Sequence, residues 1–514
     1  MDRLRGIASV LVVVIFTLGG VGAAAGQAGP SGEVVMAWHV TISPSWFDPS
    51  TAPPQITPFG MMYALHDALV RPLPGQKVGN SLAESWKESP DGRVYEFKLR
   101  RDLKFHNGDP LTTEDVKWSF ERYKGAGAKL LQERVRQVEI VDSLTVRFHL
   151  KEPWPDFMTF YGTTASAAGL VVPKRYMQQV GDEGFKKHPI GAGPYKFVSH
   201  KPGVEVVLEA NTGYWRKTPN VKRLVMKSVP ETTTRVAMLK NGEADIAVGL
   251  DGEDAMNVKR DPRLRLLPSK HASMYWIEFP DQWDPKSPWH DKRVRLAANL
   301  AIDRQAVNQA ETLGLSKVTA TIIPQNFEFA WPAPLHSFDP KRARQLLAEA
   351  GYPNGFDAGT ITLDVANTSF GEAVGNYLGA VGIRVKIRSM ERGAFFKEYA
   401  DKRLRQVIQS TSAAFGNAAT RLDAFVASDG LFAYGTYPDI EELMRKQVWE
   451  MDRGKREALL HRIQQLIHDK VMYAPLLEIA NVGGHGPRVA ESAIGMITHM
   501  SSSAPYEELR LKPK

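Results

Sequence analysis

The spacing of apolar residues predicts a chain in which strands and helices alternate throughout. Apolar side chains alternate with charged ones at residues 95–100, the pattern of a half-buried strand, and a second short strand is expected to end at His106. Thr112 and Asp115 have the spacing of a capping box, so a helix is expected to begin there. This part of the chain is therefore predicted to form a hairpin, a turn and a helix.

The middle of the chain shows the same mixture. Residues 195–208 are predicted to form a β-ribbon, because apolar and polar positions alternate along them. Residues 232–240 are predicted to form a helix that ends at Gly242, and residues 245–248 then return as a strand. The result is a strand, helix, strand unit.

Three further helices are expected in the second half of the chain. One contains residues 294–303, and another begins at Asp339, followed by proline at its first helical position, and ends before Gly351. Apolar residues recur at helical spacing over 459–467, which predicts an amphipathic helix. An α/β fold class follows from these patterns.

Composition narrows the class of protein. With 514 residues and 43% apolar side chains, the chain is too long for one core and is expected to form about two to four globular domains or lobes. Its net charge of +8 is scattered among acidic residues, which indicates a solvated surface and not a nucleic-acid site. Because the chain contains no cysteine, disulfides, thiolate metal sites and a lipid anchor on an N-terminal cysteine are excluded.

The first residues have the organisation of a secretory signal peptide. Two arginines precede an apolar run at residues 7–18, and small residues follow, with cleavage expected after Ala25 or Ala28. The apolar run is shorter than the roughly 20 residues that span a bilayer, which argues against a membrane anchor. Residues 1–28 are therefore expected to be removed, leaving a protein exported to the periplasm.

The sequence carries no local signature of catalysis. The nucleophile elbow, the H-E-x-x-H zinc helix and the phosphate-binding loop are all absent from it. His461 and His468 are seven residues apart, a wider spacing than a helical metal pair uses. His106 has no nucleophile or orienting partner nearby in sequence, so a structural turn residue is the favoured interpretation. We expect no catalytic residue, no metal site and no cofactor.

Six blocks of the sequence, in this order, resemble the ABC-transporter extracellular solute-binding proteins of family 5, the dipeptide, oligopeptide and nickel type. The first, residues 82–116, resembles the signature segment of that family. The others are 191–197, 211–215, 230–246, 294–304 and 339–356. Together the blocks extend over nearly the whole mature chain.

The resemblance implies a fold of the type II periplasmic-binding-protein kind, with two lobes, an extra third domain and a ligand cleft between the lobes. It implies a discontinuous domain I (29–72, 195–288 and 487–514), an inserted domain II (73–194) and a domain III (289–486). Such proteins capture a small ligand by hinge closure and deliver it to the permease subunits of an ABC importer. The implied protein is a monomer, is not an enzyme and binds no nucleic acid.

One segment bears on the identity of the ligand. In relatives that bind peptides, an aspartate shortly after a tryptophan in domain III receives the α-amino group, and the equivalent segment here is 410–425. Phe415 takes the place of the tryptophan, Asn417 or Ala418 that of the aspartate, and Arg421 that of another acid. These departures argue against a peptide with a free amine. They favour a polar or anionic ligand, such as a modified peptide, an opine-like compound or a glycoside, with Arg421 available to an acid group. The alternative is that Arg421 is a surface ion-pair partner.

Three aromatic residues are further candidates for ligand contact. Trp46 follows the first predicted strand, at a position where relatives of the family touch ligand. Tyr275 and Trp276 lie on the strand that approaches domain III. Ordinary core packing explains each of them equally well, because aromatic side chains fill cores as readily as pockets.

Other functions remain compatible with the sequence. The protein could present its ligand to a membrane sensor instead of a permease. A periplasmic hydrolase on the same fold would need a nucleophile and a base in contact. Nickel or haem carriage occurs in the family, but no cluster of histidines and acids supports a metal held by the protein.

Overall fold

The computed structural model describes residues 29–52, 56–125, 127–163, 166–250, 252–413, 416–497 and 505–513. The predicted signal peptide, with both candidate cleavage sites, lies outside the described residues, and so does Phe415. None of the described helices is long and apolar enough to cross a membrane.

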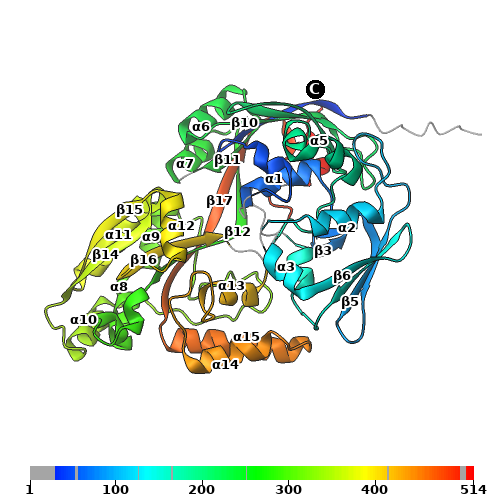
Figure 1. Cartoon of the computed structure of the whole chain (residues 1–514). Coiled ribbons are helices and arrows are strands. Elements are labelled where there is room, and N and C mark those ends of the chain that lie inside the picture. Colours follow the sequence, from blue (N-terminus) through cyan, green and yellow to red (C-terminus); the bar gives the residue numbers. More distant parts are fainter. Residues whose placement is uncertain are drawn as a thin grey trace, which may run out of the picture.

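A long mixed sheet runs through the molecule (Figure 1). In order of pairing, its strands are β15 (Ile383–Met390), β14 (Phe356–Asp364), β16 (Val407–Ala413), β12 (Arg265–Glu278), β17 (Tyr473–His485), β11 (Ile246–Leu250), β1 (Ser31–Trp38), β10 (Val221–Ser228), β9 (Glu205–Ala210) and β8 (Tyr195–Lys201). The short β13 (Lys317–Val318) also pairs with β17. We call β11, β1, β10, β9 and β8 the first half of the sheet, and β16, β14 and β15 the second half.

The strands β12 and β17 join the two halves. They pair antiparallel along their length and lie at the centre of the molecule, green and orange in Figure 1. Their register shifts between Lys270 and Ser273 and again between Tyr275 and Trp276. Such irregularities bend a strand and increase its twist, so the connection between the two halves lies at a bend.

A separate sheet, the β4–β7 sheet, lies beside the first half, at the right of Figure 1. Its strands pair in the order β4 (Ala83–Glu88), β5 (Val94–Leu99), β7 (Thr145–Leu150), β6 (Val135–Ile140). The predicted strand is β5, whose Tyr95, Phe97 and Leu99 are buried. The capping box of Thr112 and Asp115 is present and starts a helix, as the sequence predicts.

The second short strand, expected to end at His106, does not form. Lys104 makes only an isolated bridge to Pro110. The amide of Phe105 donates to the carbonyl of Asp109 at 2.9 Å, so the chain turns back on itself at once. The alternation of apolar residues is real, but it serves a tight turn whose hydrogen bonds close locally.

Helices cover both halves of the large sheet and the β4–β7 sheet. Two predictions are confirmed in detail: α6 ends at Gly242 in the left-handed conformation, and the side chain of Asp339 accepts from the amide of Arg342 at the start of α10. The helices are α1 (Ile56–Leu65), α2 (Thr113–Glu121), α3 (Ala128–Arg134), α4 (Phe157–Tyr161), α5 (Lys174–Lys187), α6 (Thr232–Asn241), α7 (Gly252–Arg260), α8 (Lys292–Ala301), α9 (Arg304–Thr312), α10 (Pro340–Glu349), α11 (Thr368–Ala380), α12 (Arg392–Ala400), α13 (Ala418–Phe425), α14 (Pro438–Gln447) and α15 (Arg453–Asp469).

Short elements complete the chain. They are the strand pairs β2 (Val70–Leu73) with β3 (Gln76–Asn80) and β18 (Val489–Glu491) with β19 (Arg510–Leu511), and the 3-10 helices η1 (Pro44–Phe47), η2 (Pro280–Trp283), η3 (Pro288–His290), η4 (Val365–Asn367) and η5 (Tyr506–Glu508).

The buried apolar side chains divide into separate cores. One core, which we call the first core, joins the first half of the sheet to the β4–β7 sheet and contains Met36 and Phe97. The second core contains Trp276 and Leu422, and the third contains Val294 and other residues around the second half of the sheet. Within the described residues two smaller cores accompany these three, one that contains Leu239 and Val258 and one that contains Met177 and Phe185. The first core lies on one side of the central part of β12 and β17, and the second and third cores lie on the other.

Candidate functional site

The predicted ligand segment lies where α13 meets α4. Asn417 is the N-cap of α13, and its side-chain oxygen accepts from the amide of Thr420 at 3.1 Å. Its side-chain nitrogen donates to a carboxylate oxygen of Asp156 at 2.7 Å, and Asp156 immediately precedes α4. Because Asn417 is only 2% exposed, it forms part of a buried contact with the side of the molecule that carries the β4–β7 sheet.

One turn along α13, Arg421 is surrounded by aromatic rings. Its guanidinium carbon lies 5.3 Å from the ring centre of Trp276 and 5.1 Å from that of Phe425. Burial lowers the pKa of Arg421 to about 9, with Tyr399 acting in the opposite direction, so the side chain remains a cation at neutral pH. Arg421 is 2% exposed, so the alternative that it is a surface ion-pair partner is wrong.

The two aromatic candidates on β12 belong to different cores. Trp276 is fully buried in the second core and packs edge to face on Phe425. Tyr275 packs against the third core, where its hydroxyl donates to Asn367 and its ring meets Phe370. The structure therefore brings Trp276 together with Asn417 and Arg421, while Tyr275 lies with another set of residues.

Trp46 is part of the first core and lies apart from that group. It belongs to the 3-10 helix η1, at Pro44–Phe47, and is 8% exposed. The neighbouring Asp48 forms a two-bond ion pair with Arg122 at the end of α2, with both distances at 2.8 Å. Trp46 thus lies in the loop after β1, close to the ion pair that joins this loop to the end of α2.

Sequence reasoning missed both Asp156, the charged partner of Asn417, and Arg456, which pairs with Asp156. Arg456, on α15, donates from one guanidinium nitrogen to Asp156 at 2.9 Å and from the other to the second carboxylate oxygen. The sequence did contain a signal for Arg456, because it falls on the same face of α15 as the buried Leu460 and Ile463. The predicted apolar face was displaced from this one, since it included Leu459, which is only half-buried.

A second missed residue is the buried acid Glu278, at the end of β12. It is 2% exposed and accepts a hydrogen bond from the hydroxyl of Tyr399. Burial raises the pKa of Glu278 from 4.5 to about 8, although Tyr399, Lys402 and Trp276 act to lower it. An acid inside the apolar stretch from Trp276 to Phe279 was the signal available in the sequence.

The histidine of the signature segment has a structural role. The amide of Gly191 donates to Nδ1 of His106 at 3.2 Å, and Nε2 of His106 donates to the carbonyl of Gly193 at 3.0 Å. Burial lowers the pKa of His106 to about 3, so the ring is neutral. The prediction of a turn histidine is confirmed, and the contact fastens residues 82–116 to residues 191–197.

The block at residues 211–215 meets the same scaffold. The hydroxyl of Tyr214 and the indole nitrogen of Trp215 both donate to one carboxylate oxygen of Asp67, at 2.8 and 2.7 Å. Arg71 donates to the Tyr214 hydroxyl at 2.8 Å, and the side chain of Asn211 donates to the carbonyl of Gly193 at 3.0 Å. These blocks therefore hold the scaffold together and lie apart from the Asn417 and Arg421 group.

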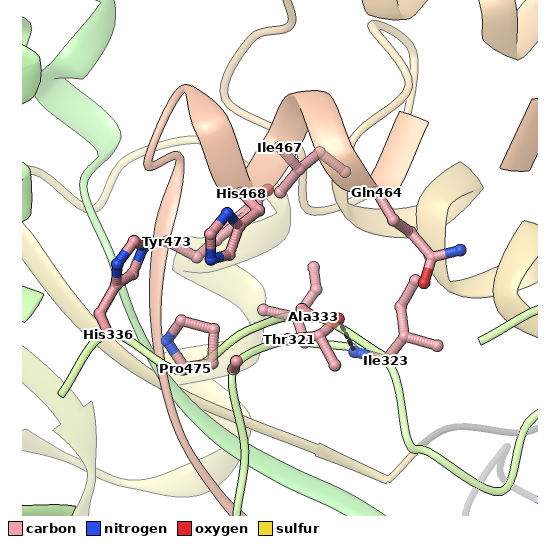
Figure 2. Close-up of a pocket in the computed structure, with 11 residues that line it drawn as sticks. Thr321, Ile323, Ala333, His336, Gln464, Ile467, His468, Tyr473 and Pro475 are labelled. Atoms are coloured by element: carbon pink, nitrogen blue, oxygen red, sulfur yellow. Dashed lines mark hydrogen bonds between the residues drawn. The ribbon is translucent and has the colours of Figure 1, made fainter. Parts of the chain in front are cut away.

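A small cavity lies between α15 and the loop around residue 321 (Figure 2). Figure 2 shows His336 and His468 at one end of it. Their rings are stacked, and the ring centres are 4.4 Å apart. Burial lowers the pKa of His336 to about 4, and the nearby His468 lowers it further. At about 20 Å³ the cavity has room for a water molecule and not for a solute.

Within the part of the chain that the structure describes, no three histidine, aspartate or glutamate side chains are grouped so that they could hold a metal ion. Asn417 therefore forms a polar contact with Asp156 on the β4–β7 side of the molecule, and the buried cation Arg421 lies one helical turn away on α13.

Comparison with known proteins shows the family. A model of "Bacterial extracellular solute-binding proteins, family 5 Middle" matches residues 77–432, well over half of the chain. The chain belongs to this family. The resemblance inferred from the six sequence blocks is therefore confirmed.

Similar proteins carry different cargoes. The chain is 26% identical over 442 residues to Heme-binding protein A of Haemophilus influenzae, covering 80% of each chain. It is 28% identical over 430 residues to the glutathione-binding protein GsiB of Shigella dysenteriae, covering 80% of this chain and 82% of that one. These family 5 relatives are binding proteins by name, and their ligands are unlike one another.

A solved structure shows the same fold. NikA of Brucella suis, in complex with Fe(III)-EDTA, superposes with a TM-score of 0.82 at 23% identity, covering 94% of this chain and all of that one. The fold of this family 5 solute-binding protein is thus the two-lobed type II periplasmic-binding-protein fold that the sequence predicts. Proteins of this fold and family capture a ligand for an ABC importer.

Proposed function

We propose that the protein is exported after removal of residues 1–28, works in the periplasm as a monomer, and captures a polar or anionic solute for an ABC importer. The proposal divides the described chain into domain I, the inserted domain II and domain III, with the boundaries that the resemblance implies. The observation that carries it is the position of the predicted ligand segment, whose Asn417 contacts Asp156 on the opposite side of β12 and β17.

Hinge closure is the mechanism that suits this architecture. The two halves of the large sheet are joined by β12 and β17, and the register shift between Lys270 and Ser273 comes just before Met274, where β12 enters the second core. Periplasmic binding proteins of two lobes close by hinge motion around their ligand. A bend in a narrow connection is where such a motion needs the fewest packing contacts to change, so the hinge is proposed at residues 270–273, before β12 enters the second core.

The ligand class follows from the charge of the segment. Arg421 is a buried cation between two rings, and the position where peptide-binding relatives carry an amine-binding aspartate holds Asn417 or Ala418. An ammonium group brought beside this cation would meet repulsion, and neither Asn417 nor Ala418 offers it a carboxylate. An acid group would gain a charge-assisted hydrogen bond, and Arg is suited to bind a carboxylate with two parallel bonds.

The cargo itself tests the function. Protein purified without denaturation is unfolded gently, and the released small molecules are identified by mass spectrometry. A bound acid, such as an opine-like compound or a modified peptide, is the expected finding. Micromolar binding of ordinary di- or tripeptides in calorimetric titration would contradict the proposed ligand class.

Arg421 provides a sharper test. Arg421→Met keeps an unbranched, flexible side chain that can pack between the two rings, although it is shorter, and removes the charge. We expect this variant to weaken binding of the identified acid by about tenfold or more, since a charge-assisted bond is worth roughly 1.5–3 kcal/mol. The neutral amide or ester of the same ligand should bind both proteins equally. If Arg421→Met lowers the melting temperature but leaves the preference for the acid unchanged, Arg421 is structural only.

A further inference from the structure

A buried ion pair fastens the β4–β7 side of the molecule to α15. Arg456 holds Asp156 through two hydrogen bonds, one of them at 2.9 Å, and both residues are less than a tenth exposed. Arg456 also donates to the side chain and carbonyl of Gln447 at the end of α14, while Asn417 donates to Asp156 from α13. Asp156 therefore enters a site whose donors come from α13 and α15, and Gln447 orients the cation.

The ion pair has neighbours along the same edge. The guanidinium carbon of Arg134, at the end of α3, lies 4.5 Å from the ring centre of Trp449, a tryptophan that is 52% exposed. A Cβ placed on Gly92 would come within 2.6 Å of the methyl carbon of Met451, so the turn before β5 touches the loop between α14 and α15. These contacts all join residues 92–159 to residues 416–456.

The side chain of Asp156 does not stabilise its own helix, α4. It is the N-cap residue of α4, yet its side chain makes no capping hydrogen bond there. Both of its carboxylate oxygens are used by Arg456, and one also by Asn417. A buried carboxylate is costly unless it is paired, so its presence at this position is explained by the partner across the edge and not by local structure.

We propose that Asp156, Asn417, Gln447 and Arg456 form a latch that holds the two lobes closed, so that part of the closing free energy comes from the protein itself and not from the solute. This inference rests on the proposed hinge closure. When the lobes separate, Asp156 and Arg456 become hydrated. The latch therefore opposes opening by the difference in free energy between the buried, doubly bonded ion pair and the two hydrated charges. Because hydration offsets much of the loss of the pair, opening stays reversible. The inserted β4–β7 region then takes part in closure.

The absence of cysteine from the sequence allows a direct test. Cysteines introduced at Ser143, in the turn after β6, and at Arg445, on α14, are both exposed and can carry two nitroxide labels. The distance between the labels is measured by electron–electron double resonance on protein freed of solute by unfolding, dialysis and refolding. We expect most molecules of the parent protein to show the shorter of two label distances, which is that of the closed form.

Asp156→Asn is the decisive variant, because it keeps the shape of the side chain and removes the charge. The ratio of closed to open molecules should fall by about tenfold or more, as for the loss of one member of a buried charge pair. Arg456→Gln should have the same effect, and the double variant should be no more open than either single one, because both changes break the same pair.

Asp48→Asn is the matched control. Asp48 is fully buried and pairs with Arg122 through two bonds, as Asp156 does with Arg456, but the neighbours of both residues, Phe47 and Tyr123, belong to the first core. Asp48→Asn should lower the melting temperature and leave the label distance unchanged. An unchanged distance in Asp156→Asn, or an equal change in Asp48→Asn, would overturn the latch. Because the measurement needs no solute, a failure to find any ligand would count against the proposed function and leave the latch standing.

Discussion

At the scale of single residues, Glu278 makes the stability of the protein depend on pH. Its pKa rises from 4.5 to about 8 in the folded protein because burial removes the carboxylate from water, and this effect outweighs Tyr399 and Lys402, which act to lower the pKa. Below pH 4.5 the acid is protonated in the folded and the unfolded chain alike. Between pH 4.5 and 8 the unfolded chain releases its proton and the folded chain retains it, so stability falls by up to about 1.4 kcal/mol per pH unit.

Glu278→Gln tests this dependence. The amide keeps an oxygen that can accept from Tyr399 and does not titrate, so the variant should lack this contribution. The melting temperature of the parent protein, compared with that of the variant, is expected to decline from pH 5 to pH 8 and to level off above. A constant difference between the two proteins over this range would show that Glu278 is already ionised in the folded state.

Residue-level prediction from the sequence succeeded where the partners are local. The capping box at Thr112 and the turn that contains His106 are closed by hydrogen bonds between residues a few positions apart. The partner of Asn417 is 261 residues away, and that of Arg456 is 300 residues away, so no local pattern could name Asp156 for either. Only the place of Arg456 on an apolar helix face could have marked it.

At the scale of elements, the cap of α10 is expected to control local opening of that helix. Asp339 accepts from the amide of Arg342 at 2.9 Å, and the helix buries Ala343, Leu346 and Leu347. Asp339→Ala should cost about 1 kcal/mol of helix stability, which corresponds to about fivefold faster hydrogen exchange in peptides that cover Pro340–Glu349. The experiment compares exchange rates by mass spectrometry.

Asp339→Asn is the control for the same helix, since asparagine caps a helix about as well as aspartate does. Its exchange should stay close to that of the parent protein. Equal acceleration in both variants would mean that the charge of Asp339 matters and the capping hydrogen bond does not.

Helices such as α6 and α10 were predictable because each carries its own start or stop signal in the sequence. The strand expected to end at His106 failed for a physical reason, because alternation of apolar residues describes burial and does not supply a pairing partner. The pairing of β12 with β17 joins residues about 200 positions apart. Neither this pairing nor its bends could be predicted from the local pattern of apolar residues.

At the scale of the whole molecule, the division into cores predicts how the protein unfolds. The first core lies on one side of β12 and β17, the second and third lie on the other, and no buried residue belongs to more than one of them within the described chain. Two parts with separate cores unfold in one cooperative transition only if the contacts between them are strong enough to couple their unfolding. Here the coupling includes the two strands, the latch at Asp156 and the neighbouring contacts of Trp449 and Met451.

Calorimetry of the full chain without solute should therefore show more than one transition, with a calorimetric enthalpy greater than the van 't Hoff enthalpy. Asp156→Asn should move the transitions apart, because it weakens the coupling, whereas Asp48→Asn should lower only the transition of the part that contains the first core. A solute that binds between the lobes should bring the transitions together, since it stabilises only the joined state. A single two-state transition in the Asp156→Asn variant would show that the coupling between the cores does not depend on the latch.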